Sequence, residues 1–468
     1  MRLHILKPFP VVLRISAGLI ILSAFVLVGC DDDFEEHSPD YELQFSEDTV
    51  LFDTIFTETP SITQQFKVQN PHSKDIQISS IELGQGQDSY YRINVDGKGG
   101  TSFDDFTLGA EDSIFVFVDL RIDQTDKDNP FIVRDSVRFV GQDGLQDHVK
   151  LMAWGQDARF YRNEAVCDET WDERKPYVVF NSIIVPEGCR LDIEPGTNIH
   201  SHFNSSILVQ GTMEAIGEPD QPITFTGDRL DDFHEDRPGQ WIGIRFLAGS
   251  RDNIMNHTKV TNGVRGIQVD SLPVNNNPNL ILQNSVVQNM NQIGVLGNTA
   301  HINFINSVIS DCGQHLFAGV LGGEYEFFHT TLSNPSIAFA HDNPSFIANN
   351  ADFDPDEGSG FVTDLSITMV NSILWGTLDN ELGLVEEGDG ELEVNIASNL
   401  LKTQLDELEE FNMVNEDPKF EEPSEMNYRL RENSPAIEAG REDLGIDTDI
   451  EGNSRKDTPD LGAYESDF

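Results

Sequence analysis

The sequence predicts an all-β protein in which a parallel β-helix follows an antiparallel β-sandwich. Three observations support this fold class. A short phrase returns through the second half of the chain, and its runs are rich in β-branched residues bounded by Asn, Gly, Ser or Asp, as strands are. No window shows the sustained i, i+3, i+4, i+7 apolar spacing of an amphipathic α-helix. A repeated unit built from strands points to a solenoid.

The repeated phrase sets the size of each coil. It begins with Asn, His or Ser, at His257, Asn284, Asn306, His329, Asn371 and Ser398. The steps are 27, 22, 23, 42 and 27 residues, so we interpret the step of 42 as one coil with an inserted loop. Asn tolerates left-handed backbone, and its amide can bond to the next coil, which predicts a turn at this position. Unrelated strands of a sandwich would not produce a fixed period.

The spacing, the Asn-Ser-Val/Ile phrase and the C-terminal stretches 434–440 (SPAIEAG) and 460–465 (DLGAYE) resemble a known family. They are similar to right-handed parallel β-helix lipoproteins of bacterial envelopes, of the pectin-lyase-like superfold, with a choice-of-anchor closing motif. The resemblance covers about residue 165 to the end and implies the fold. It implies little about activity, because this superfold hosts lyases, hydrolases, epimerases, adhesins and inert scaffolds.

The chain begins with a segment typical of secretion. Cationic residues precede an apolar run from Ile15 to Val28, and the run ends in Leu-Val-Gly-Cys at Cys30. This ending resembles a lipobox, which implies a signal peptide over 1–29, a lipid on Cys30 and a membrane partner through that lipid. An uncleaved anchor is the alternative, but the run is short for a span of about 20 apolar residues.

An acidic tether over 30–40 follows, rich in Asp and Glu from residue 31 to 36. Such a run resembles a signal for the outer face of the outer membrane in some lineages and an inner-membrane retention signal in others. The fold family favours the surface. We therefore expect an outer-membrane lipoprotein of the cell envelope, exposed at the surface.

The formal net charge of −51 limits the partners. Such a surface repels phosphate backbones, so we expect no nucleic acid partner. Dense carboxylates need screening or bound Ca²⁺, and we favour a solvated acidic surface over dedicated metal sites.

The cysteines suggest one bridge. With Cys30 lipidated, an exported chain can pair Cys167 with Cys189 at the first coil. Cys312 would then remain as a small buried apolar residue.

The segment 41–157 has the texture of an immunoglobulin-like β-sandwich, because short alternating strands are separated by polar turns. It looks like the modules that often stand between a lipid anchor and a functional domain, so we expect a spacer or docking role. No Cys-Trp-Cys core signature is present, which limits this inference to architecture.

The β-helix is expected over 158–468, with a core packed by Val, Ile, Leu and Phe instead of a channel. One candidate ligand groove for an anionic sugar gathers cations and an aromatic residue, namely Arg229, Arg237, Trp241, Arg245 and Arg251. The alternative, which we favour, is local pairing with Asp231, Asp232, Glu235 and Asp236.

Residues 266–401 contain no Lys or Arg. Polysaccharide lyases of this superfold usually need a cationic base and charge neutralisation, so this absence weighs against a lyase. Paired carboxylates could still hydrolyse a neutral glycan.

Two acidic clusters are candidates for Ca²⁺. Asp352, Asp354 and Asp356 alternate as in a calcium loop, but their Gly falls one place late and Thr363 replaces the last ligand. Asp447, Asp449 and Glu451 lie in the closing stretch, which we interpret first as a structural cap over about 418–468 that covers the open end of the solenoid. We assign His200 and His202, on one strand face, a structural role.

The leading functional hypothesis is a non-catalytic envelope protein that binds glycans or another surface, with polysaccharide or envelope proteins as partners. A carbohydrate-active enzyme, either lyase or glycoside hydrolase, and a purely structural stalk are the alternatives. We lean against an enzyme, because no catalytic residue stands out.

Overall fold

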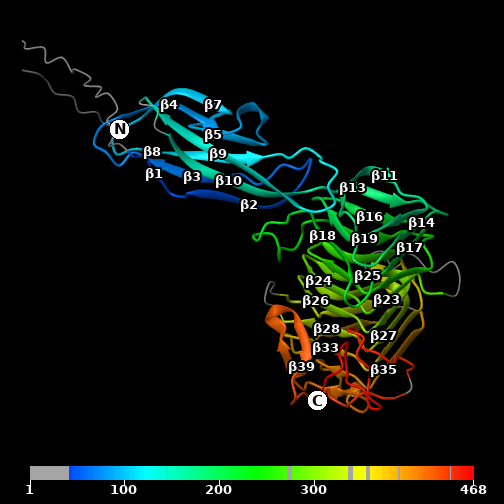
Figure 1. Ribbon diagram of the computed structural model, residues 1–468. Helices are drawn as coiled ribbons and strands as arrows, with labels where there is room; N and C mark the ends of the chain where they lie inside the picture. Colours follow the sequence, from blue (N-terminus) through cyan, green and yellow to red (C-terminus); the bar gives the residue numbers. More distant parts are fainter. Residues whose placement is uncertain are drawn as a thin grey trace, which may run out of the picture.

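The computed structural model describes residues 42–467 except 143, 145, 271–276, 336–340, 355–358, 388–389 and 443. The predicted signal peptide, Cys30 and the acidic tether lie outside these residues. No α-helix occurs in the described part, and hence none there is long and apolar enough to cross a membrane. A sandwich and a long parallel solenoid follow one another along the chain (Figure 1). The predicted all-β fold class is therefore confirmed.

The sandwich consists of two five-stranded sheets. The first has the order β1 (Gln44–Phe45), β3 (Gln64–Gln69), β8 (Ser113–Leu120), β5 (Tyr91–Val95), β6 (Lys98–Gly100). The second has the order β2 (Thr49–Phe56), β10 (Gln146–Gln156), β9 (Phe131–Gly141), β4 (Ile76–Leu83), β7 (Ser102–Leu108). All pairs are antiparallel except β2 with β10. Alternate residues face the core, as β8 shows: Val116 and Val118 are buried whereas Phe115 and Phe117 are exposed.

The solenoid has three parallel faces on which each strand pairs with its equivalent one coil later. The first face comprises β12 (Glu169–Trp171), β14 (Arg190–Ile193), β17 (Thr212–Ile216), β20 (Asn253–Asn256), β23 (Leu280–Gln283), the second halves of β25 (Ile293–Ile305) and β27 (His315–Phe328), β32 (Leu365–Val370) and β35 (Leu392–Ala397). The second comprises β15 (Asn198–Ser201), β18 (Ile223–Gly227), β21 (Thr258–Thr261), β24 (Val286–Met290), β26 (Val308–Cys312), β28 (Thr331–Asn334), β33 (Ile373–Gly376), β36 (Leu400–Leu401) and β37 (Met413–Val414).

The third face comprises β16 (Ser206–Val209), β19 (Gly243–Phe246), β22 (Arg265–Asp270), the first halves of β25 and β27, β29 (Phe346–Asn349) and β34 (Leu382–Val385). β11 (Arg159–Ala165) and β13 (Tyr177–Val185) pair in parallel as equivalent strands of the first two coils, and β13 bends so that its first half pairs with β15 and its second half with β16. The 42-residue step does contain an insertion, the hairpin of β30 (Ala351–Asp354) and β31 (Ser359–Val362). Short 3-10 turns occur at η1 (Gly86–Asp88), η2 (Asp406–Leu408) and η3 (Pro423–Glu425).

The repeated phrase forms the turn that leads into the second face. All six of its first residues have a left-handed backbone, with φ between 46° and 62°, at His257, Asn284, Asn306, His329, Asn371 and Ser398. Their side chains bond along the axis, because the Asn306 amide donates to Asn284 Oδ1 at 3.1 Å and the Asn371 amide donates to His329 Nε2 at 3.0 Å. The predicted role of this position is confirmed.

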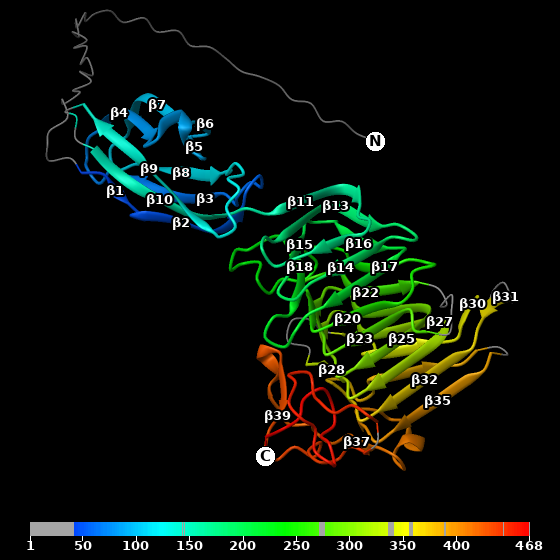
Figure 2. The same ribbon diagram turned by 45° about the vertical axis from the view of Figure 1, so that its right-hand side comes forward.

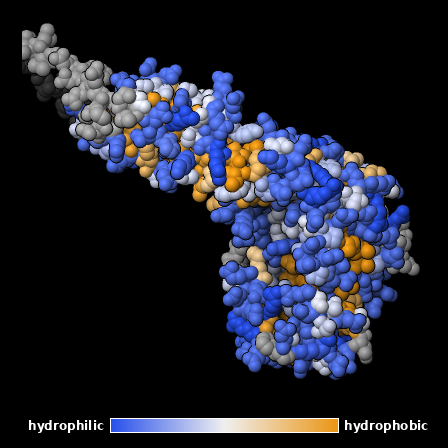
Figure 3. Space-filling model, viewed as in Figure 1, coloured by the Kyte–Doolittle hydropathy of each residue, from blue (hydrophilic) through white to orange (hydrophobic). Residues whose placement is uncertain are grey.

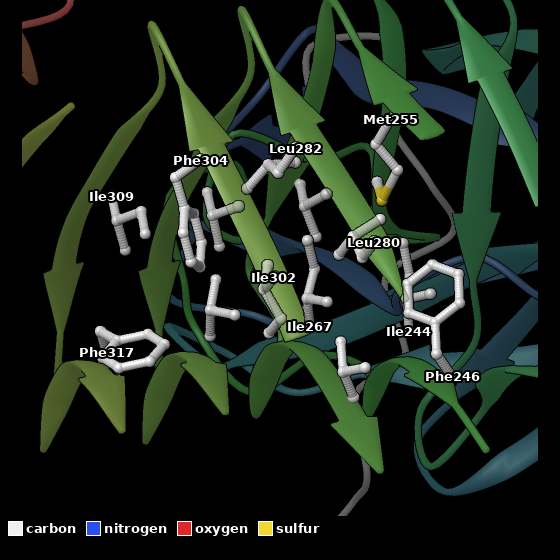
Figure 4. Packing of buried hydrophobic residues seen from close by; sticks show 14 of the residues in the cluster. Ile244, Phe246, Met255, Ile267, Leu280, Leu282, Ile302, Phe304, Ile309 and Phe317 are labelled. Carbon is white, nitrogen blue, oxygen red and sulfur yellow. The ribbon is translucent and has the colours of Figure 1, made fainter. Parts of the chain in front are cut away.

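The interior is a packed core, as predicted. Inward-facing side chains from all three faces meet along the axis, and most are fully buried (Figure 4). The rings of Phe304 and Phe327, one coil apart, stack with centroids 4.3 Å apart. A filled axis leaves ligands only the outer surface and the junction with the sandwich.

The C-terminal segment packs along the side of the coils, which corrects our expectation that it covers the open end (Figure 2). Its hairpin of β38 (Phe420–Glu422) and β39 (Asn427–Leu430) and the following loops bury outer residues of the second face, including Val308, Ile373 and Leu400. Near the C-terminal end of the solenoid, its hydrophobic core is instead contacted by Leu405 and Leu408, around η2. The physical reason is that the outer side of the second face is apolar and requires a cover.

Candidate functional site

The junction between the sandwich and the β-helix holds an apolar contact and a pocket beside it. Phe56 from β2 packs on Ala158 and Val178, and Phe180 and Leu230 adjoin this cluster. Hydrophobic residues gather at this junction on the molecular surface (Figure 3). The two domains thus share a small core, and the loop that follows β18 extends towards the end of β2 (Figure 1).

The pocket has a volume of about 180 Å³ and is lined by both domains. The sandwich contributes residues 52–56 and 59–62, and the β-helix contributes Phe180, His202 and residues 228–231. Domain interfaces are a common location for ligand sites, which combine apolar walls with a few polar groups. Neither domain alone forms this pocket.

The charged side chains of the pocket pair with one another. His202 Nδ1 lies 2.6 Å from Asp228 Oδ2, and Arg229 Nε lies 3.4 Å from Asp231 Oδ2. Asp231 also accepts His234 Nδ1 at 2.6 Å. Arg229 is the one Lys or Arg among the lining residues. The positive charge of the one Arg in the lining is therefore offset by a neighbouring carboxylate, which weakens its attraction for an anionic ligand.

Asp53 is an exposed carboxylate at the rim of the pocket. Partial burial raises its pKa, the negative charges of Asp232 and Asp231 raise it further, and a hydrogen bond from the Asp232 backbone opposes them. Because Asp53 belongs to β2 and Asp232 to the β-helix, this group connects the two domains. It offers two oxygen acceptors to a ligand.

Aromatic rings stand at the wall and near the pocket. Phe180 is half-buried, and its ring centroid lies 4.8 Å from that of His202. Phe203, next to His202, and Phe233, in the loop after Asp231, are 64% and 62% exposed. Rings beside acceptor-rich polar groups suit a ligand with apolar faces and many hydroxyls, because the hydroxyls donate to carboxylates while the faces pack on the rings.

The structure corrects most of the predicted groove. Trp241 is fully buried and its Nε1 donates to Thr261 O at 2.8 Å, so its place in a groove was wrong. Arg245 pairs with Asp270 at 2.5 Å on the third face. Arg237 stacks on Phe233, with its guanidinium 3.7 Å from the ring centroid. Arg229 alone lines the junction pocket, and exposed Arg251 does not. Local pairing is confirmed for Arg229, which meets Asp231.

The candidate calcium residues of the closing stretch serve the fold. The Asp449 carboxylate accepts the backbone amides of Glu451, Asn453 and Glu465. Glu451 pairs with Arg429, and Asp447 is exposed. Their oxygens do not form a described metal-binding group, so Ca²⁺ at this place is not supported. The side chains of Asp352 and Asp354, and residue Asp356, lie outside the described part.

The remaining predicted residues are the cysteines and the two histidines of the first coils. A disulfide joins Cys167 to Cys189, and Cys312 is a buried free cysteine. His200 and His202 lie on one strand face and meet aromatic rings: His200 packs on Phe56 of the sandwich, with ring centroids 4.9 Å apart. Two residues of the pocket, Asp53 and Phe180, were missed by sequence reasoning, because nothing in the chain signals that they meet.

No protein-family model matches the chain, and no curated protein matches it. Several solved structures align with parts of the chain, among them the following three. The ASH / PapD-like domain of human CEP192 is 10% identical, over 30% of this chain and 97% of that chain, with a TM-score of 0.18. A protein of unknown function from Porphyromonas gingivalis is 14% identical, over 27% and 60%, with a TM-score of 0.19.

The third is the catalytic domain of a GH87 alpha-1,3-glucanase in complex with tetrasaccharides. It is 9% identical, over 75% of this chain and 80% of that chain, with a TM-score of 0.22. The fold class rests on the strand pairing described above.

Proposed function

We propose that this protein is a lipid-anchored protein of the cell envelope that binds a neutral glycan, without catalysis, in the pocket between its two domains. The observation that carries the proposal is the pocket itself, which places the half-buried ring of Phe180 beside the carboxylates of Asp53 and Asp228. The ring supplies an apolar wall, and the exposed carboxylate of Asp53 accepts hydrogen bonds from hydroxyls, whereas Asp228 is held by His202.

The charge pattern supports a neutral ligand. The net charge of −51 repels polyanions, and Arg229 in the pocket is already paired with Asp231. A uronate or sulfated polymer would therefore meet repulsion, whereas a neutral glycan would not. Non-catalytic binding fits the paired state of the acids, because His202 occupies Asp228 and both Arg229 and His234 occupy Asp231.

The experiment is a screen of the full-length protein, purified in detergent, against neutral and acidic polysaccharides. We expect binding to a neutral polymer, without release of reducing or unsaturated ends. Asp53→Asn should weaken binding roughly tenfold or more, because it removes a charged acceptor. Phe180→Leu, which keeps apolar bulk but loses the flat ring, should weaken it roughly threefold.

Two matched controls lie far from the pocket. Asp104→Asn changes an exposed carboxylate of β7, and Phe411→Leu changes an exposed ring in the last coil, so both should bind as the parent does. Release of sugar products would contradict non-catalytic binding and show that the protein is a carbohydrate-active enzyme. Absence of binding to every polymer, or equal binding by the pocket and control variants, would favour a stalk that acts through protein partners.

The anchor is tested separately. Full-length protein made in Gram-negative cells is expected to incorporate a labelled fatty acid, and the Cys30→Ala variant is expected to incorporate none, because the thiol that carries the lipid is gone. Cys312→Ala, which removes a buried free cysteine, is the control and should incorporate the label as the parent does. Incorporation of the label by the Cys30→Ala variant would contradict lipidation at this residue.

A further inference from the structure

Three potential metal ligands meet on the outer side of the first face, several coils away from the junction. His301 lies on β25, and Glu324 and Glu326 lie on β27 of the next coil (Figure 2). His301 stands directly opposite Glu324 in the parallel register, and Glu326 lies two residues further on the same side. The fold therefore brings together one imidazole and two carboxylates.

The atoms are close enough to share one ion. The two carboxylates face different nitrogens of the ring, because His301 Nδ1 lies 3.5 Å from Glu324 Oε2 and His301 Nε2 lies 3.7 Å from Glu326 Oε2, and an ion would take only one of these nitrogens. One ligand atom from each residue falls within 4.8 Å of the others, and no other such group of His, Cys, Asp or Glu occurs in the described part of the chain. Ligands of a tetrahedral zinc ion are roughly 3.4 Å apart, so small side-chain rotations complete the site.

One nitrogen of the His301 imidazole is buried without a hydrogen bond. His301 is only 9% exposed, and its buried Nε2 makes no hydrogen bond. Asn303, which pairs in register with Glu326, has a buried Oδ1 that is likewise without a hydrogen bond. A buried polar atom without a partner is costly, and an ion at this place would remove that cost.

The local charge also calls for a cation. Glu324 and Glu326 project side by side, and residues 266–401 contain no Lys or Arg that could neutralise them from these coils. Two adjacent carboxylates repel one another, and a divalent ion converts this repulsion into attraction.

We propose that His301, Glu324 and Glu326 bind a divalent transition-metal ion of the Zn²⁺ class. The imidazole selects this class over Ca²⁺ and Mg²⁺, which prefer oxygen ligands alone. Three protein ligands leave one position for an exogenous group, and the Glu324 side chain, 53% exposed, opens that position to solvent. The site shares no residue with the junction pocket, so either proposal can fail without the other.

The test uses full-length protein in detergent, stripped with a chelator and then titrated with Co²⁺ and Zn²⁺ in excess Mg²⁺ to saturate nonspecific acidic sites. We expect one Co²⁺ per chain with the visible absorption of a low-symmetry site, displaced by Zn²⁺ and not by Ca²⁺. His301→Gln and Glu326→Gln should each weaken binding at least about 100-fold, because even outer-shell losses cost roughly 10- to 100-fold.

The matched control is Glu393→Gln. Glu393 is exposed on β35 of the same face, in register with Ser366, which itself pairs with Glu324. It should leave the Co²⁺ spectrum and affinity unchanged. The metal should raise the melting temperature of the parent and of this control but not of the two ligand variants, which should match the parent in chelator. Binding that Ca²⁺ displaces, or that all three variants share, would overturn the proposal.

Discussion

Acidification from pH 7 to pH 4 is expected to cost about 3 kcal/mol of stability through His329 alone. Burial lowers the pKa of His329 to about 3, and the positive charge of Arg455 lowers it further. Because this folded pKa lies below the value of the unfolded chain, the contribution is fully present above pH 6.5 and is lost as the pH falls towards 3. In addition, His329 Nε2 must stay unprotonated to accept the Asn371 amide.

The variant His329→Asn separates this effect from the titration of the carboxylates. Asn occupies the equivalent positions 306 and 371 with the same left-handed backbone, so it fits the turn. Denaturant unfolding at pH 7 and pH 4 should show a drop that is about 3 kcal/mol smaller in the variant than in the parent. Equal drops in both proteins would show that His329 does not stay neutral when folded.

Arg455→Met is expected to destabilise the protein by roughly 3 to 5 kcal/mol, because it leaves a buried carboxylate without its partner. Arg455 and Glu465 form an ion pair at 3.2 Å, and both side chains are 3% exposed. Arg455 also donates to Asn306 Oδ1 at 2.8 Å and to Gly462 O at 3.0 Å. This side chain therefore joins the C-terminal segment to the row of Asn turns.

Arg429→Met in the same segment is the control, because its pair with Glu451 is largely exposed and should be worth less than about 1 kcal/mol. Denaturant midpoints of the two variants give the comparison. Adding Glu465→Gln to Arg455→Met should recover part of the loss, since the unpaired charge is then gone. Similar losses of stability for Arg429→Met and Arg455→Met would mean that burial does not increase the contribution of the Arg455–Glu465 pair.

The repeat could be predicted from the sequence, but the assignment of residues to the three faces of the solenoid could not. A left-handed turn residue every 22 to 27 positions follows from local chemistry, so the coils and the turns at Asn284 and Asn306 were predictable. Whether a strand residue points into the core or outwards follows from the alternation of side chains along a strand. Which of three faces a residue occupies depends on the bends between strands, and Arg229 and Arg245 therefore reached different places.

The pocket and the metal cluster depend on distant pairings. Asp53 and Asp231 meet only because the two domains pack on Phe56, and no local signal encodes that contact. His301 and Glu324 are 23 residues apart, one coil, so the repeat spacing could have paired them had the register been known. The apolar outer side of the second face was equally invisible, which is why the C-terminal segment was expected elsewhere.

The disulfide between Cys167 and Cys189 has a mechanical consequence. In a solenoid each coil holds only its neighbours, so a pull from the N-terminal end would peel coils away one at a time. The bridge spans 22 residues at the beginning of the β-helix, and that loop cannot lengthen under load. Without the disulfide, those residues could extend to about 70 Å under load, and the disulfide prevents this extension. Once β11 has detached, tension from the sandwich therefore meets a covalent ring.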